Sequence, residues 1–274
     1  MKRLFWLSSA AAALALAIGL PLAAQGRANG GRGAATQPAA AASPTPRHWY
    51  SVNLVTVKRE SVEEWREFTR TQTIPMQQRG GVKSRDTYQS GAPFGDGLTY
   101  GIVTPIDKFE DYDKPPLVAR MLSGDALRTY QQKNAQLVAS NHMFAIQDRA
   151  ELSIPPASMA KVRGVILSDV TIVGGHAEQY EAYIKNDLLP VLKKGNVLGY
   201  SVPRTVFGGN ANEYHTAQYF ESYGDIDKGP LTVRVLGQAA SQALAAKATP
   251  HIASIQRTIL RYVPELSFAP KPTS

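Results

Sequence analysis

The sequence predicts an α+β protein in which one unit of roughly 115 residues occurs twice in tandem. An ordered series of internal matches indicates the duplication, and both copies show the same alternation of strand-like and helix-like segments. A change of composition near residue 47 marks where the folded part begins. With 43% hydrophobic residues, the 274-residue chain has enough apolar side chain to bury a core.

The internal matches follow one another in the same order in both copies. The segment IPMQQRGGV from Ile74 matches LPVLKKGNV from Leu189, and DKPPLVARMLSG from Asp113 matches DKGPLTVRVLG from Asp227. The copies also end alike, in Glu-Leu-Ser. Chance does not produce such an ordered series, so we expect one repeat at 47–154 and a second at 160–268.

Each repeat is expected to contain a strand, a helix, two strands, a second helix and a final strand. The first helix begins after Ser61, where Glu64 completes the pattern of a capping box, and glycines such as Gly80 end it. Runs rich in Val, Ile, Thr and Tyr mark the strands. In the two copies we expect strands at 50–57 and 162–172, 82–89 and 197–206, 98–104 and 213–221, and 142–150 and 256–263. The second helices end near Asn141 and Ser254.

This β-α-β-β-α-β order is the ferredoxin-like motif, a four-stranded antiparallel sheet with both helices on one face. The other face of each sheet would stay uncovered in a single copy. Two copies can bury these faces against each other, so the sequence predicts two ferredoxin-like repeats that form a pseudo-dimeric α/β barrel.

The order of elements resembles the dimeric α/β-barrel superfamily, in particular its NIPSNAP-like and antibiotic-biosynthesis-monooxygenase-like branches. Further resemblance rests on Pro75 and Pro190 before the turns, and on the aromatic helix positions Trp65 and Tyr180. The resemblance implies a cavity shared by two sheets. The superfamily includes cofactor-free oxygenases, haem enzymes, isomerases and members without known activity, so the fold does not choose a function.

The N-terminal residues indicate export. Lys2 and Arg3 precede an apolar stretch, and Ala23 and Ala24 supply a cleavage site, so we predict a signal peptide at 1–24. The rival interpretation is an uncleaved membrane anchor. Residues 25–46 are rich in Gly, Ala and Pro, which is typical of a flexible linker. We therefore expect a periplasmic or secreted protein with no membrane contact after cleavage.

The composition limits the partners that this protein can bind and the kinds of chemistry that its side chains can perform. The chain has no cysteine, which excludes disulfides, thiol nucleophiles and thiolate metal sites. Its formal charge of +8 falls to +6 when Lys2 and Arg3 leave with the signal peptide. The basic residues are dispersed and not interleaved with aromatic residues, so no nucleic-acid partner is expected.

Among the five histidines, His215 is the strongest candidate for a catalytic group. It lies within a predicted strand of the second copy, where the first copy has Gly101, and it could transfer protons near physiological pH. Arg204 or Tyr214 could then steer a substrate. The alternative is an ordinary hydrogen-bonded strand histidine.

Four further residues are candidates for ligand binding. Asn53 and Asp169 are polar residues inside apolar strands, where burial without a partner is costly. Tyr100 corresponds to Tyr214 across the repeat and could flank a cavity. His251 lies where haem enzymes of the superfamily carry a proximal histidine, but no surrounding motif matches. We therefore predict no cofactor and no metal.

The leading functional hypothesis is that the protein binds a small apolar or aromatic molecule in the cavity between the two sheets. A cofactor-independent oxygenase or isomerase with His215 as base is the alternative from the enzyme class. A structural or assembly protein with a filled barrel is the third. The chain is expected to act as a monomer or as a homodimer.

Overall fold

The computed structural model describes residues 48–91 and 95–269. The predicted signal peptide and linker lie outside these residues. Among the described helices, none is long and apolar enough to cross a membrane.

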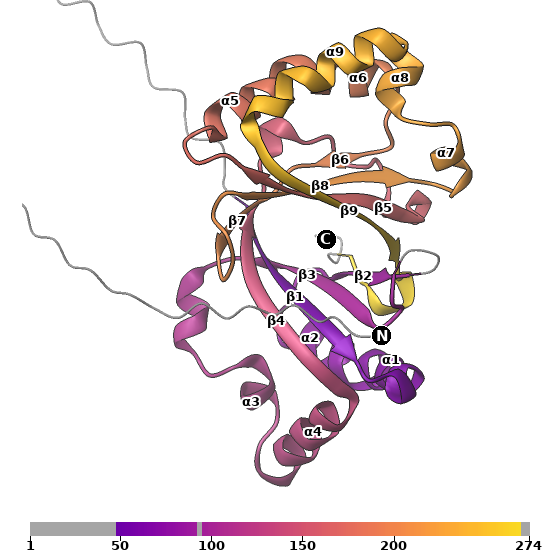
Figure 1. The fold of residues 1–274 in the computed structure, drawn as a ribbon. Helices are drawn as coiled ribbons and strands as arrows, with labels where there is room; N and C mark the ends of the chain where they lie inside the picture. The colour runs from indigo at the N-terminus through magenta and orange to yellow at the C-terminus, as the bar shows by residue number, and fades with distance from the viewer. Residues whose placement is uncertain (1–47, 92–94, 270–274) are drawn as a thin grey trace, which may run out of the picture. The chain divides into compact units, whose positions relative to one another are not determined.

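The two halves of the described chain have similar orders of elements, with one additional strand and one additional short helix in the second half (Figure 1). The first half contains β1 (Trp49–Val57), α1 (Val62–Phe68), α2 (Ile74–Arg79), β2 (Asp86–Ser90), β3 (Thr99–Ile106), α3 (Leu117–Met121), α4 (Gly124–Leu137) and β4 (Val138–Gln147). The second half contains β5 (Gly164–Ile172), α5 (Ala177–Tyr183), α6 (Leu189–Lys194), β6 (Tyr200–Ser201), β7 (Arg204–Phe207), β8 (Glu213–Phe220), α7 (Gly224–Asp227), α8 (Leu231–Leu236), α9 (Gln238–Ala248) and β9 (Ile252–Tyr262).

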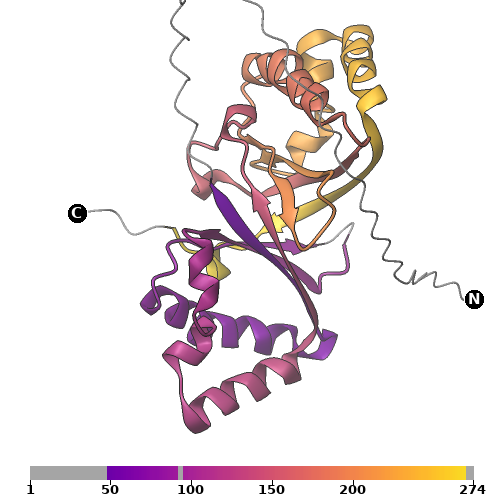
Figure 2. The same ribbon diagram turned by 90° about the vertical axis from the view of Figure 1, so that its left-hand side faces the viewer.

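The strands form one closed antiparallel barrel. The order is β4-β1-β3-β2 in the first half and β9-β5-β8 followed by β6 and β7 in the second. Two seams join the halves, where β2 pairs with β9 and β4 pairs with β7. The helices of each half cover the outer face of their own sheet (Figures 1 and 2). Each half therefore leaves the inner face of its sheet to be covered by the other half.

Several predicted boundaries were wrong. Both second helices end before the predicted positions, at Leu137 and Ala248, because β1 and β5 pair with the chain from Val138 and Ile252 onward. The predicted strand 197–206 is two short strands, since Pro203 between them has no N–H to donate. Ser61 is buried and makes no side-chain cap bond, so the expected capping box does not form.

The two halves complete each other's cores. Leu152, which follows β4, is packed in the core of the second half with Tyr180 and Tyr214. Leu266, which follows β9, is packed in the core of the first half with Trp65 and Tyr100. Ion pairs reinforce both exchanges, from Arg149 to Glu181 on α5 and from Glu265 to Arg66 on α1. Neither half has a complete core without the segment that the other supplies.

Between the two sheets lies a third, smaller apolar cluster. Tyr88, Val165 and Ala217 are its buried members, and partly buried side chains such as Leu260 and Tyr262 pack against them. This cluster fills part of the barrel interior in which the sequence predicted a ligand cavity.

Candidate ligand-binding site

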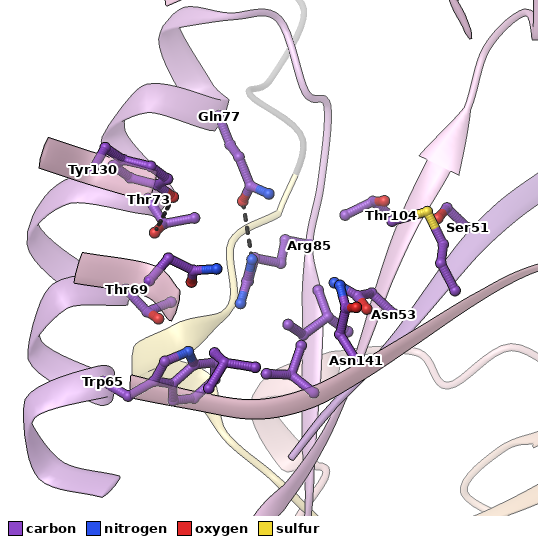
Figure 3. Close-up of a pocket in the computed structure, with 15 residues that line it drawn as sticks. Ser51, Asn53, Trp65, Thr69, Thr73, Gln77, Arg85, Thr104, Tyr130 and Asn141 are labelled. Atoms are coloured by element: carbon purple, nitrogen blue, oxygen red, sulfur yellow. Dashed lines mark hydrogen bonds between the residues drawn. The ribbon is translucent and has the colours of Figure 1, made fainter. Parts of the chain in front are cut away.

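A pocket with many polar lining groups lies between the sheet and the helices of the first half (Figure 3). Its cavity volume is about 240 Å³. Strands β1, β3 and β4 form its floor, and α1, α2 and α4 form its wall. Its polar lining residues are Ser51, Asn53, Thr69, Thr73, Gln77, Arg85, Thr104, Tyr130, Asn134 and Asn141.

Arg85 directly precedes β2, and among the described residues it is the only charged one that lines this pocket. Its exposed fraction is 2%. Its Nε donates to the carbonyl oxygen of Leu266 at 2.9 Å and to Thr87 Oγ1 at 3.1 Å, and Nη1 donates to Gln77 Oε1 at 3.1 Å. Burial lowers the pKa of Arg85 to about 10, so the guanidinium is still cationic at neutral pH.

Two buried polar atoms of the pocket have no hydrogen-bond partner among the described residues, Arg85 Nη2 and Asn53 Oδ1. A buried polar group without a partner is costly, and native proteins leave few of them. The first atom is a cationic donor and the second is an acceptor. A molecule with an anionic oxygen and a donor group would satisfy both.

In the second half, apolar side chains fill the space that corresponds to this pocket. Gln77 corresponds to Leu192 and Thr69 to Ile184, and both of these are core residues of the second half. Arg85 corresponds to Tyr200, another core residue. The same fold can thus close this space with apolar side chains, and the first half keeps it open and polar.

His215, on β8, points into the barrel interior. Its Nδ1 lies 2.7 Å from Asp169 Oδ1 on β5, and its Nε2 lies 2.7 Å from Thr205 Oγ1 on β7. The ring also lies against Phe144 of β4, with 5.4 Å between centroids. The structure therefore brings together two of the predicted residues, His215 and Asp169, and adds Thr205.

Tyr214 and Arg204 do not join His215. Tyr214 is adjacent to His215 on the strand and points to the opposite, helix-covered face, where its hydroxyl donates to Glu181 Oε1 at 2.6 Å. The guanidinium of Arg204 lies over the ring of Tyr214, 5.6 Å from its centroid. Neither of the two residues that were expected to steer a substrate therefore lies in one site with His215.

The remaining candidates are dispersed. Asn53 lines the pocket of Figure 3, whereas Tyr100 is fully buried beside it, and its hydroxyl accepts from Gln89 Nε2 at 2.9 Å. His251 lies after α9, with its Nδ1 3.1 Å from that of His176. Across residues 48–91 and 95–269, no three His, Asp or Glu side chains form a group that could hold a metal.

Sequence reasoning missed Arg85, Gln77 and Thr73. The signal was present in the repeat itself, since three polar residues of the first helical region, Thr69, Thr73 and Gln77, align with Ile184, Leu188 and Leu192. Polar residues along the core-facing stripe of a helix indicate a polar interior. Arg85 had no such signal, because its burial depends on the chain segment that follows β9.

A partly buried carboxylate on the inner face of β2, that of Asp86, provides a test by pH. Burial is the main cause that raises the pKa of Asp86, partly offset by the hydroxyl of Tyr262. A carboxyl group whose pKa is higher in the folded than in the unfolded state stabilises the folded state at a pH below its unfolded pKa of about 3.9. That stabilisation is lost as the pH rises through the folded-state pKa. Asp86→Asn is therefore expected to raise the midpoint of urea unfolding at pH 7 and leave it unchanged near pH 3. Asp227→Asn, at an exposed position, is the matched control, and a destabilised Asp86→Asn at pH 7 would contradict the argument.

No family model and no curated protein matches the chain. Solved structures do match it. A candidate monooxygenase from Lactobacillus acidophilus aligns with a TM-score of 0.56 and 9% identity, over 82% of this chain and 97% of that one. A variant of chlorite dismutase from Candidatus Nitrospira defluvii aligns with a TM-score of 0.51 and 10% identity, over 81% and 93%. The chain therefore shares the fold of these proteins, a closed antiparallel barrel with helices on its outer faces.

An anthrone oxidase-like protein supports the same conclusion, with a TM-score of 0.52 and 11% identity over 80% of this chain and 94% of that one. At such identities the likeness establishes the α/β barrel and no activity. The NIPSNAP-like branch expected from the sequence stays a prediction.

Proposed function

We propose that this α/β-barrel protein binds a small organic anion in the pocket between the sheet and helices of its first half. One observation carries the proposal, the buried and cationic Arg85 with an unpaired Nη2. A buried charge without a counter-charge is strongly unfavourable, and a bound anion removes that cost. Asn53 Oδ1 supplies an acceptor for a donor group on the same molecule.

The leading sequence hypothesis also proposed a small-molecule ligand, but it placed the binding site in the cavity between the two sheets. The pocket lies outside the barrel, under the helices, and its lining is rich in hydroxyl and amide groups. The apolar cluster around Tyr88 occupies part of the space between the sheets. The ligand is accordingly expected to carry polar groups and is not a plain hydrocarbon.

A catalytic role is the second candidate. It is favoured by the arrangement of Asp169, His215 and Thr205, in which both ring nitrogens of one histidine lie 2.7 Å from side-chain oxygens. A carboxylate that fixes the imidazole tautomer is a common support for a general base. The similar structures include a candidate monooxygenase and an anthrone oxidase-like protein. A cofactor-independent oxygenase or isomerase therefore stays the enzymatic alternative.

The proposal includes export and a duplicated origin. We infer from the sequence that residues 1–24 are removed as a signal peptide and that the mature protein is periplasmic or secreted. The exchanged segments around Leu152 and Leu266 support a tandem repeat that acts as a pseudo-dimer. Such a chain can function as a monomer or as a homodimer.

The experiment is calorimetric titration of the mature protein with benzoate, together with native mass spectrometry of protein isolated from its own cell envelope. Arg85→Met is expected to weaken benzoate binding at least 30-fold, because removal of one partner of a buried charge pair costs about 2–5 kcal/mol. Arg120→Met, at an exposed arginine, is the control and should bind as the wild type does. Equal affinity in the two variants, with both folded, would overturn the proposal.

A further inference from the structure

A second cavity adjoins the pocket on the same outer face of the sheet. Its volume is about 360 Å³, and its apolar lining includes Ile106, Phe109, Tyr112 and Phe207. Ser51 and Met143 line both cavities. The two cavities therefore adjoin, and we refer to them together as the trough, with a polar end at Arg85 and an apolar end at Phe207.

Strand register shows how the trough runs. Ser51 pairs with Thr104 on one side and with Ala145 on the other, and Ala145 pairs with Phe207. Arg85 precedes Asp86, which pairs with Val103, so Arg85 lies beside Thr104. The five residues form one row across β2, β3, β1, β4 and β7. Four spacings of about 4.8 Å give the row a length of roughly 19 Å.

The apolar end of the trough is exposed. Among the described residues, six large hydrophobic side chains are exposed, and the four that line this cavity are Phe109, Tyr112, Met143 and Phe207. The ring of Phe109 packs edge-on against Trp49 and Phe207, at 5.3 and 5.7 Å between centroids. An exposed apolar patch of this kind is typical of a ligand groove.

The trough has a single positive charge. Within residues 48–91 and 95–269, Arg85 is the only charged side chain that lines either cavity. The single buried cation at the polar end can neutralise one carboxylate, which has one negative charge. It cannot neutralise a phosphate with two negative charges. In the second half, Arg257 occupies the position that corresponds to Met143, so that half has a cation where the trough has an apolar side chain.

Resting on the proposed function, we propose that the ligand is a monoanionic amphiphile, a carboxylate with an extended alkyl or aromatic tail. Its carboxylate pairs with Arg85 under the helices, and its tail passes Met143 and lies against Phe109 and Phe207. The polar end sets which headgroup binds, and the apolar end adds affinity in proportion to the tail that it covers.

Titration with straight-chain carboxylates tests the proposal, with butyrate, octanoate and dodecanoate as probes below their micelle concentrations. Affinity is expected to rise about fourfold per added methylene until the groove is filled, the fold-change that corresponds to about 0.8 kcal/mol. Dodecyl phosphate and dodecyltrimethylammonium are expected to bind at least tenfold more weakly than dodecanoate. Vesicles of anionic lipid, which present phosphate headgroups on a surface, are expected not to bind.

Variants separate the two ends of the trough. Phe207→Ser, at an exposed position that lines the apolar cavity and not the pocket of Arg85, is expected to flatten the dependence on tail length and leave butyrate binding unchanged. Ile255→Ser, at an exposed hydrophobic residue outside the groove, is the control. If butyrate and dodecanoate bind equally well and both depend on Arg85, the amphiphile proposal is wrong and the anion site stands. If no carboxylate binds, both proposals fail, and vesicle binding would assign the groove to a membrane surface instead.

Discussion

Gln77→Leu is expected to lower the free energy of unfolding by about 1–3 kcal/mol, and Arg85→Met in the same chain is expected to restore most of that loss. The reason is the bond of 3.1 Å from Arg85 Nη1 to Gln77 Oε1. Gln77→Leu leaves a second guanidinium nitrogen unpaired beside Nη2, in a pocket whose described lining residues include no acidic side chain. The double variant removes both partners of this bond and so leaves neither of them unpaired. The carbonyl oxygen of Leu266, which also loses Arg85, still accepts from Thr87 Oγ1 at 2.7 Å.

Chemical unfolding of the two single variants and the double variant gives the coupling energy directly. Gln78→Leu, one residue further and exposed, is the matched control and should lie within about 0.5 kcal/mol of the wild type. If the changes in unfolding free energy of the two single variants add up to that of the double variant, Gln77 does not support Arg85. A stable double variant that no longer binds benzoate would show that the polar pocket costs stability and is kept for its ligand.

The internal sequence matches made much of the fold predictable. Matches such as Asp113 with Asp227 predicted two similar units, and the alternation of elements within each unit predicted the α+β barrel that the structure has. The boundaries were less predictable because they depend on partners far away in the chain. Val138–Asn141 could extend a helix by local preference, but pairing with β1 makes these residues a strand.

The candidate site was predictable only in part. His215 and Asp169 were singled out as polar residues in strands, and they prove to be partners across β5 and β8. Tyr214 was expected beside His215, but a one-residue step along a strand reverses the face, so neighbours in sequence cannot share a site. Arg85 could not be recognised, because its acceptor on Leu266 is 181 residues away in the chain.

Leu152→Ala and Leu266→Ala are each expected to lower the free energy of unfolding by about 2–5 kcal/mol, the usual cost of truncating a fully buried leucine. Their exposed fractions are 2% and 1%. Each leucine is packed in the core of the other half. The loss of stability is therefore expected first in the half that does not contain the leucine's preceding strand. Leu266→Ala should reduce hydrogen-exchange protection first in β1 and β3, and Leu152→Ala first in β5 and β8.

Leu54→Ala is the matched control, since Leu54 lies on β1 and is 37% exposed, and its effect should stay below about 1 kcal/mol. Loss of protection in the second half for Leu266→Ala would contradict the exchange of core segments. The exchange also bears on the pocket, because the segment that carries Leu266 holds Arg85 through its carbonyl oxygen. Leu266→Ala is therefore expected to weaken benzoate binding as well, whereas Leu152→Ala, equally destabilising, leaves the affinity of the folded protein unchanged. The second half thus contributes to the site through one buried segment, which gives a physical reason for the two halves to stay in one chain.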